Sequence, residues 1–160
     1  MDNIIEENVT FIPGNVPSLK NSKIKTSKGI FPSKIVSRYL KSFGIEHYSS
    51  SKKTVKINKK FNNKTFIDYF NKNDLEKINN IRKNKEPIII AFHFIRDSNR
   101  RFDFGNACQI ICDLMTAYDI IEDDNMNCLI PIPMKINDKW FSYNKENPGV
   151  IIKVLNNNEL

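Results

Sequence analysis

Acidic residues stand at both ends of one helical stretch of this chain, next to arginines. Arg100 and Arg101 come just before Asp103, and Asp123 and Asp124 follow the stretch. Carboxylates that converge repel one another unless a cation neutralises them. Mg²⁺ prefers oxygen ligands and binds through one or two carboxylates together with a substrate phosphate. Two interpretations are therefore open: a magnesium site that acts on a phosphate, or a helix-capping aspartate and a solvated acidic turn.

The composition is that of one basic globular domain. The chain has 160 residues, 40% of them hydrophobic, and a formal net charge of +7. A basic excess favours phosphate-bearing partners, on nucleic acid or on an anionic membrane. No apolar run approaches the ~20 residues of a spanning helix, and the acidic N-terminus lacks the basic start of a signal peptide. We expect a cytoplasmic protein with no membrane partner.

The three cysteines do not suggest a disulfide framework, because their number is odd and no secretory signal is present. Cys108 and Cys112 are four residues apart on the predicted helix, so a metal pair is conceivable. However, the only histidines are His47 and His93, and Cys128 forms no CxxC motif with another cysteine. Small apolar packing residues are the favoured interpretation.

Hydrophobic periodicity predicts both strands and helices along the chain. The strand predicted at 87–96 is continuously apolar and is expected at the centre of a sheet. The strand predicted at 127–136 is interrupted by Pro131 and Pro133, so it is expected at an edge of the sheet. A helix at 65–84 is expected to break near Asn73, with Asp74 capping its second piece. The remaining elements are strands at 8–12, 28–33 and 150–155, and helices at 34–43 and 104–118.

These elements predict an α/β (α+β) fold, in which a small mixed β-sheet is packed with helices. No linker divides the chain, so residues 1–160 are expected to form one domain with a lysine-rich insertion around 46–86. Within the insertion, 47–64 is either a loop or an added basic hairpin, and later in the chain 138–149 is expected to be a loop.

The helix at 104–118 is amphipathic. Its polar side carries Asn106, Gln109 and Asp113, and this edge continues from Asp103. The opposite, apolar face consists of Ala107, Ile110, Ile111, Leu114 and Tyr118. The helix is therefore expected to be half buried. The periodicity does not say whether Asp103 and Asp124 meet.

The stretch RRFDFGNACQIICDLMTAYDIIEDDNM, residues 100–126, resembles the signature region of the RusA family of Holliday junction resolvases, especially its phage-encoded members. GNVPSLKNSK similarly resembles the family's Pro-Ser-x-Asn loop, which lies close to the active site. The resemblance frames residues 14–126, although 46–86 matches nothing in the family pattern. It implies a RusA-like fold for the single domain.

The resemblance also implies an activity: a homodimeric crossover junction endodeoxyribonuclease that depends on Mg²⁺, with Mn²⁺ as an alternative ion. Such an enzyme resolves four-way junctions and other branched DNA by symmetric nicks, in recombination, repair or phage DNA processing. By position, Asp103 and Asp124 match two essential metal-binding, catalytic acids. Asp123 and Asn106 are further candidate metal ligands. A phage-encoded protein would act in the host cytoplasm.

Two positions depart from the family pattern. Gly105 stands where the family has its second aspartate, and Gln109 stands where it has a helix lysine. The first change removes a metal ligand, and the second removes a cation that could stabilise charge developing on the phosphate. The alternative is therefore a catalytically weakened or inactive protein that binds junction DNA. A basic RNA-binding domain is a third, weaker hypothesis.

Basic and amide side chains near the motifs are the candidate DNA contacts. His93 is expected to be a packed residue and not a general base. Trp140 and Phe141 are expected in the core or in a dimer interface, and not as a base-stacking platform. The candidate DNA-binding residues are Lys20, Asn21, Lys23, Arg96, Arg100 and Arg101.

Overall fold

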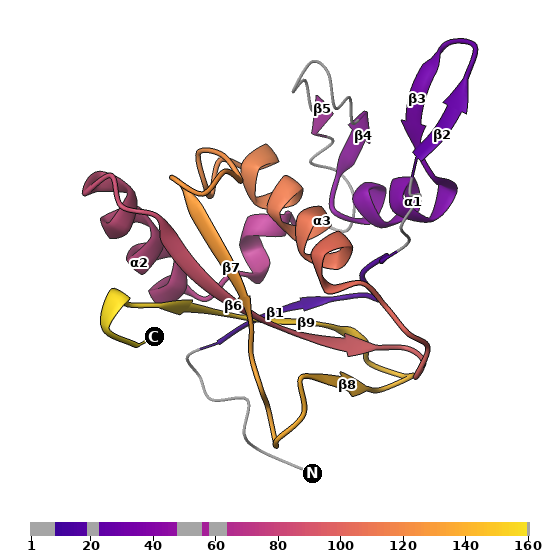
Figure 1. Cartoon of the computed structure of the whole chain (residues 1–160). Helices are drawn as coiled ribbons and strands as arrows, with labels where there is room; N and C mark the ends of the chain where they lie inside the picture. Colours follow the sequence, from indigo (N-terminus) through magenta and orange to yellow (C-terminus); the bar gives the residue numbers. More distant parts are fainter. Residues whose placement is uncertain (1–8, 19–22, 48–55, 58–63, 160) are drawn as a thin grey trace.

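The computed structural model describes residues 9–18, 23–47, 56–57 and 64–159. Its main feature is a mixed five-stranded sheet built around β6 (Ile88–Arg96). On one side of β6 lies β9 (Gly149–Leu155), antiparallel to it, followed by antiparallel β1 (Thr10–Pro13). On the other side, β7 (Leu129–Pro133) and then β8 (Phe141–Tyr143) pair in parallel with successive parts of β6 (Figure 1).

The helices cover one face of this sheet (Figure 1). They pack on a core that includes the fully buried rings of Phe66, Phe92 and Phe94. Among the described residues, no helix is both long and apolar enough to cross a membrane. The helical elements are α1 (Lys34–Ser42), the 3-10 turn η1 (Phe66–Tyr69), α2 (Lys72–Lys83), α3 (Phe104–Ala117) and the 3-10 turn η2 (Asn157–Glu159).

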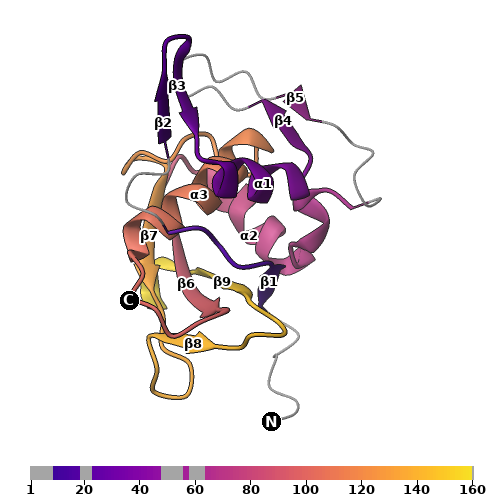
Figure 2. The same ribbon diagram turned by 90° about the vertical axis from the view of Figure 1, so that its right-hand side faces the viewer.

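Two small hairpins stand outside the main sheet. The first, β2 (Lys23–Thr26) with β3 (Gly29–Pro32), projects from the body as an arm beyond α1 (Figures 1 and 2). The second pairs β4 (Ile45–His47) with β5 (Lys56–Ile57). Only β5 and the last residue of β4 fall within 47–64, the segment for which a loop or an added basic hairpin was open, so part of that segment is paired with the residues before it.

The predicted fold class is confirmed, since a mixed sheet is packed with helices. The central position of β6 and the edge position of β7 are confirmed as well. Residues 138–149 are not simply a loop, because they contain β8. Three residues are too few for periodicity to distinguish a strand from a loop, and here only the pairing with β6 defines the strand.

The second half of the proposed insertion belongs to the core. The helical stretch breaks at Phe70, and Asn71 rather than Asp74 caps α2. Asp74 is 2% exposed, and its Oδ2 accepts a hydrogen bond of 2.7 Å from the Thr10 hydroxyl. The same hydroxyl accepts a 2.9 Å bond from the Asn71 backbone N–H. Asp74 was expected to cap the helix, but it instead links α2 to β1 through Thr10.

His93 fastens β8 to the sheet. Its side chain is 1% exposed, with Nδ1 3.0 Å from the Met134 carbonyl and Nε2 2.7 Å from Ser142 Oγ. A carbonyl only accepts, so Nδ1 carries the proton and Nε2 accepts from the serine hydroxyl. Burial lowers the pKa of His93, and the hydrogen bond to Met134 opposes this effect. As expected from the sequence, His93 is a packed residue.

We expect the stability of the fold to fall as the pH drops through the histidine range. The pKa of His93 lies below its ordinary value of 6.5 in the folded chain, so the unfolded chain binds more protons just below that pH. The free energy of unfolding, measured with urea between about pH 7.5 and 5, should therefore decrease towards acid. The decrease should be smaller in His93→Gln.

The His47→Gln variant is the control for that measurement, since His47 is the other histidine of the chain. A His93→Gln protein whose stability still fell as steeply as that of the wild type would show that His93 does not titrate differently on folding.

Candidate active site

Asp103 begins α3. Its side chain caps the helix, with Oδ1 accepting a 3.0 Å hydrogen bond from the Asn106 backbone N–H. The side chain is exposed, and Phe102 and Phe104 on either side of it are half-buried. The cap interaction uses one carboxylate oxygen, so capping and metal binding do not exclude each other at this residue.

Asn106 stands beside Asp103 with an unpartnered amide. Its Nδ2 is buried and has no hydrogen-bond partner among the described residues. The two ends of an amide are assigned rather than observed, and a half-turn of the group places its oxygen where the nitrogen stands. Asp103 and Asn106 can thus offer two oxygen ligands at the start of α3, which fits part of a Mg²⁺ site.

The faces of α3 are those that the sequence predicts. Ala107, Ile110, Ile111 and Leu114 are buried, while Gln109 is exposed. Cys108 and Cys112 are also buried and free, in keeping with packing residues. At the end of the helix the Tyr118 hydroxyl donates to the Phe43 carbonyl, so α3 is held against the end of α1.

The acidic pair lies in the turn that leads from α3 into β7. Asp123 Oδ1 accepts a 2.9 Å bond from the Asp124 N–H, and its Oδ2 accepts a 2.9 Å bond from Asn125 Nδ2. The Asn125 carbonyl in turn accepts from the N–H of Leu129, the first residue of β7. Asp123 shapes the turn, and the Asp124 side chain is left exposed.

The two acidic groups lie at opposite ends of α3 (Figure 1). The helix has 14 residues, which correspond to about 21 Å. Because β7 is parallel to β6 and Leu129 pairs with Ile88, α3 carries the chain back toward the start of β6, where β7 begins.

Neighbouring charges and burial act on Cys112, in the second half of α3. The pKa of the Cys112 thiol is raised by its hydrogen bond with Cys108, by burial, and further by the charges of Asp113 and Asp124. Cys112 is about 13 Å along the axis from Asp103. In the described part of the chain, no group of three or more histidine, cysteine or acidic side chains is placed to hold a metal ion.

Arg96 anchors the Pro-Ser loop beside Asp103. Its guanidinium donates to the Val16 carbonyl and to Ser18 Oγ at 3.3 Å, and it lies 4.9 Å from the centre of the Phe102 ring. The Asp97 N–H donates to Asn15 Oδ1 at 3.1 Å. Arg96 is only 9% exposed, so we reassign it from a phosphate contact to a structural anchor.

The other candidate DNA contacts differ in how they are placed. Arg100 and Arg101 are exposed immediately before Asp103 and form no ion pair with another described residue. Lys20 and Asn21 lie outside the described residues. Lys23 begins β2, but its side chain is outside the description.

The aromatic residues in β8 and directly before it are not core residues. Trp140 is 57% exposed and Phe141 is 40% exposed, so the core alternative is wrong for both, and the dimer-interface alternative stays a prediction. Tyr143, which the sequence analysis did not single out, is 49% exposed. The alternation Phe-Ser-Tyr could have indicated this surface from the sequence, since it places two rings on one face of a strand.

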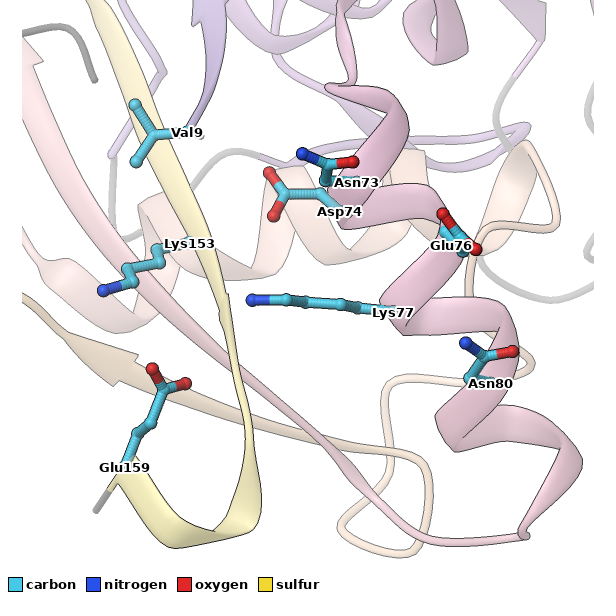
Figure 3. A pocket seen from close by; sticks show the side chains of 8 residues that line it. All are labelled: Val9, Asn73, Asp74, Glu76, Lys77, Asn80, Lys153 and Glu159. Carbon is cyan, nitrogen blue, oxygen red and sulfur yellow. The ribbon is translucent and has the colours of Figure 1, made fainter. Parts of the chain in front are cut away.

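The structure also contains a cavity away from these motifs. It has a volume of about 480 Å³ and lies between α2 and β9, with Lys77 and Lys153 extending from the two sides (Figure 3). None of the acids that flank α3 lines it. Its lining residues are Val9, Asn73, Asp74, Glu76, Lys77, Asn80, Lys153 and Glu159.

Comparisons with known proteins leave the family open. No family model, no curated protein and no solved structure matches this chain. A function must therefore be inferred from the site residues themselves.

A substitution at Gly105 tests directly whether the start of α3 binds a metal ion. A Cβ at this exposed position would lie 3.3 Å from Asp103 Oδ1, and the exposed Asp103 side chain can move away. In Gly105→Asp the two carboxylates should repel each other without metal and be drawn together by Mg²⁺. We expect Mg²⁺, relative to EDTA, to raise the thermal unfolding midpoint more in this variant than in the wild type.

Gly105→Asn is the matched control. Either substitution removes a helical glycine, a change worth about 0.5–1 kcal/mol, but only aspartate adds charge. An equal response of the two variants to Mg²⁺ would mean that Asp103 and position 105 do not form a cation site.

Proposed function

We propose that this chain is a Mg²⁺-dependent endonuclease of the RusA type that acts on branched DNA as a homodimer. The supporting observation is the placement of two incomplete sets of oxygen ligands at opposite ends of one half-exposed helix. Asp103 and Asn106 stand at the start of α3, and Asp123 and Asp124 follow its end. Neither set alone is a complete metal site.

A two-fold axis across α3 would complete both sets. Two antiparallel copies of the helix would place Asp103 and Asn106 of one copy beside Asp123 and Asp124 of the second copy. A symmetric dimer then has two identical sites, as paired nicks in two strands require. Gly105 and Gln109 are exposed at this edge, and glycine permits close approach of the second helix.

Exposed cations lie next to Asp103 in the chain and on the projecting arm. Arg100 and Arg101 can bind backbone phosphates next to the acids, and the arm β2–β3 carries exposed Lys25 and Lys28. A bound Mg²⁺ would neutralise charge on the phosphate and supply an activated water at neutral pH. Asp103 and Asp124 would hold the ion, and in-line attack by water would leave 5′-phosphate and 3′-hydroxyl ends.

A second candidate function is junction binding without cleavage. It is favoured by Gly105 and Gln109, because positions 105 and 109 then supply neither a carboxylate nor an ammonium group. Incubation of a labelled four-way junction with Mg²⁺ or with EDTA separates the two candidates. Binding in both conditions with nicking in neither would favour the second.

We expect Asp103→Asn and Asp124→Asn each to lose Mg²⁺-dependent nicking and to keep junction binding. The loss should exceed the roughly 10- to 100-fold effect of removing a group that only supports a metal ligand. Binding should persist because each change removes a negative charge that repels DNA phosphate. Single-turnover nicking and gel-shift titrations measure the two effects.

Glu122→Gln is the matched control, because Glu122 is an exposed acid in the same turn that has no proposed role. Wild-type nicking rates in either aspartate variant would identify that residue as a cap or a surface acid.

A further inference from the structure

Strand β8 exposes two aromatic rings on one face. Phe141 is 40% exposed and Tyr143 is 49% exposed. They are two residues apart on the strand, so they point the same way, while Ser142 points to the other face and binds His93. Exposed apolar groups gathered in this way commonly mark a binding surface.

The Phe141 ring and the backbone of β8 are held in place before any partner arrives. The Phe141 ring lies 5.2 Å from that of Phe102, nearly perpendicular to it, and Phe102 lies under the Arg96 guanidinium. The backbone of β8 pairs with β6, with Phe94 opposite Phe141 and Arg96 opposite Tyr143. Binding at Phe141 would therefore cost little ordering of its side chain.

The surroundings of the rings are those of a nucleic-acid surface. Phe102 is the neighbour of Asp103 in sequence and follows exposed Arg100 and Arg101, and Lys145 is exposed just beyond Tyr143. The carboxylates at this edge are Asp97, Glu146 next to Lys145, and Asp103, the last of which is a proposed metal ligand. Flat apolar groups next to cations fit the bases and phosphates of a single strand.

A second copy of the chain fits this surface less well. A stable protein interface buries about 800 Å² per partner, whereas even a fully buried aromatic side chain contributes only about 150–250 Å². Two half-exposed rings fall well short of that area, but each can cover one base.

We propose that Phe141 and Tyr143 stack on unpaired bases at the branch point of a DNA junction. This inference rests on the proposed action on branched DNA. A junction can present unpaired bases and a continuous duplex cannot, so the two rings would give the protein a preference for branched over linear DNA. Stacking accepts any base, because every base has a flat face.

The test compares the wild type with Phe141→Ala, Tyr143→Ala and the double variant, in EDTA to prevent cutting. Fluorescence anisotropy gives the Kd for a four-way junction and for a duplex of equal length. We expect each single variant to bind the junction about 5- to 100-fold more weakly and the duplex about as well as the wild type. Phe141→Leu keeps an apolar side chain without a flat ring and should resemble Phe141→Ala.

Trp140→Ala is the matched control. Trp140 is 57% exposed and precedes β8, so it lies outside the strand that carries the two rings, and Lys135 Nζ lies 5.1 Å from its ring centre. Its junction affinity should stay at the wild-type value. Circular dichroism confirms that each variant is folded, and Tyr143→Ala makes the test independent of the Phe141–Phe102 contact.

A junction with 2-aminopurine at the branch point supplies a direct signal, because stacking on a ring changes its fluorescence. The wild type should change it, and the double variant should not. Wild-type junction binding with unaltered affinity in every ring variant would overturn the stacking inference and leave the proposed function standing. A wild type that bound no branched DNA would overturn both the stacking inference and the proposed function. Ring variants that became monomers in light scattering would instead show a dimer interface.

Discussion

The crossover from β6 through α3 to β7 is the constraint on which the site depends. Parallel strands need a long connection, and a helix in that connection runs antiparallel to both strands. A residue that follows β6 and a residue that precedes β7 are therefore held at opposite ends of the helix. Asp103 and Asp124 occupy those two positions, so the same geometry that completes the sheet prevents one chain from bringing the two acids together.

Three fixed contacts make this arrangement rigid at the Asp103 end. Arg96 and the Asp97 N–H hold the loop from Asn15 to Ser18, Phe102 packs between Arg96 and Phe141, and His93 holds β8 through Ser142. The arginine, the aromatic rings and the acid thus come from β6, from the connection to α3 and from β8. The two proposals rest on this convergence at the Asp103 end.

Much of the fold could be predicted from the sequence, because its signals were local. The continuous apolar run of β6 and the 3.6-residue period of α3 identify their elements, and both are present. The roles of Arg96 and Asp74 could not be predicted, since their partners Val16 and Thr10 are distant in the chain. The exposure of Phe141 was missed for a similar reason: aromatic residues pack in most sequences, and only the position of β8 decides otherwise.

A mixing experiment tests most directly whether each site is shared between two copies of the chain. Asp103→Asn and Asp124→Asn proteins, each inactive alone, are unfolded together and refolded to exchange subunits. A shared site predicts that each mixed dimer has one intact site, so that an equal mixture recovers about a quarter of the wild-type nicking rate. If the acids of a single chain formed the site, every subunit would carry a defect. A mixture as inactive as its components, beside an active wild type, would contradict the shared site.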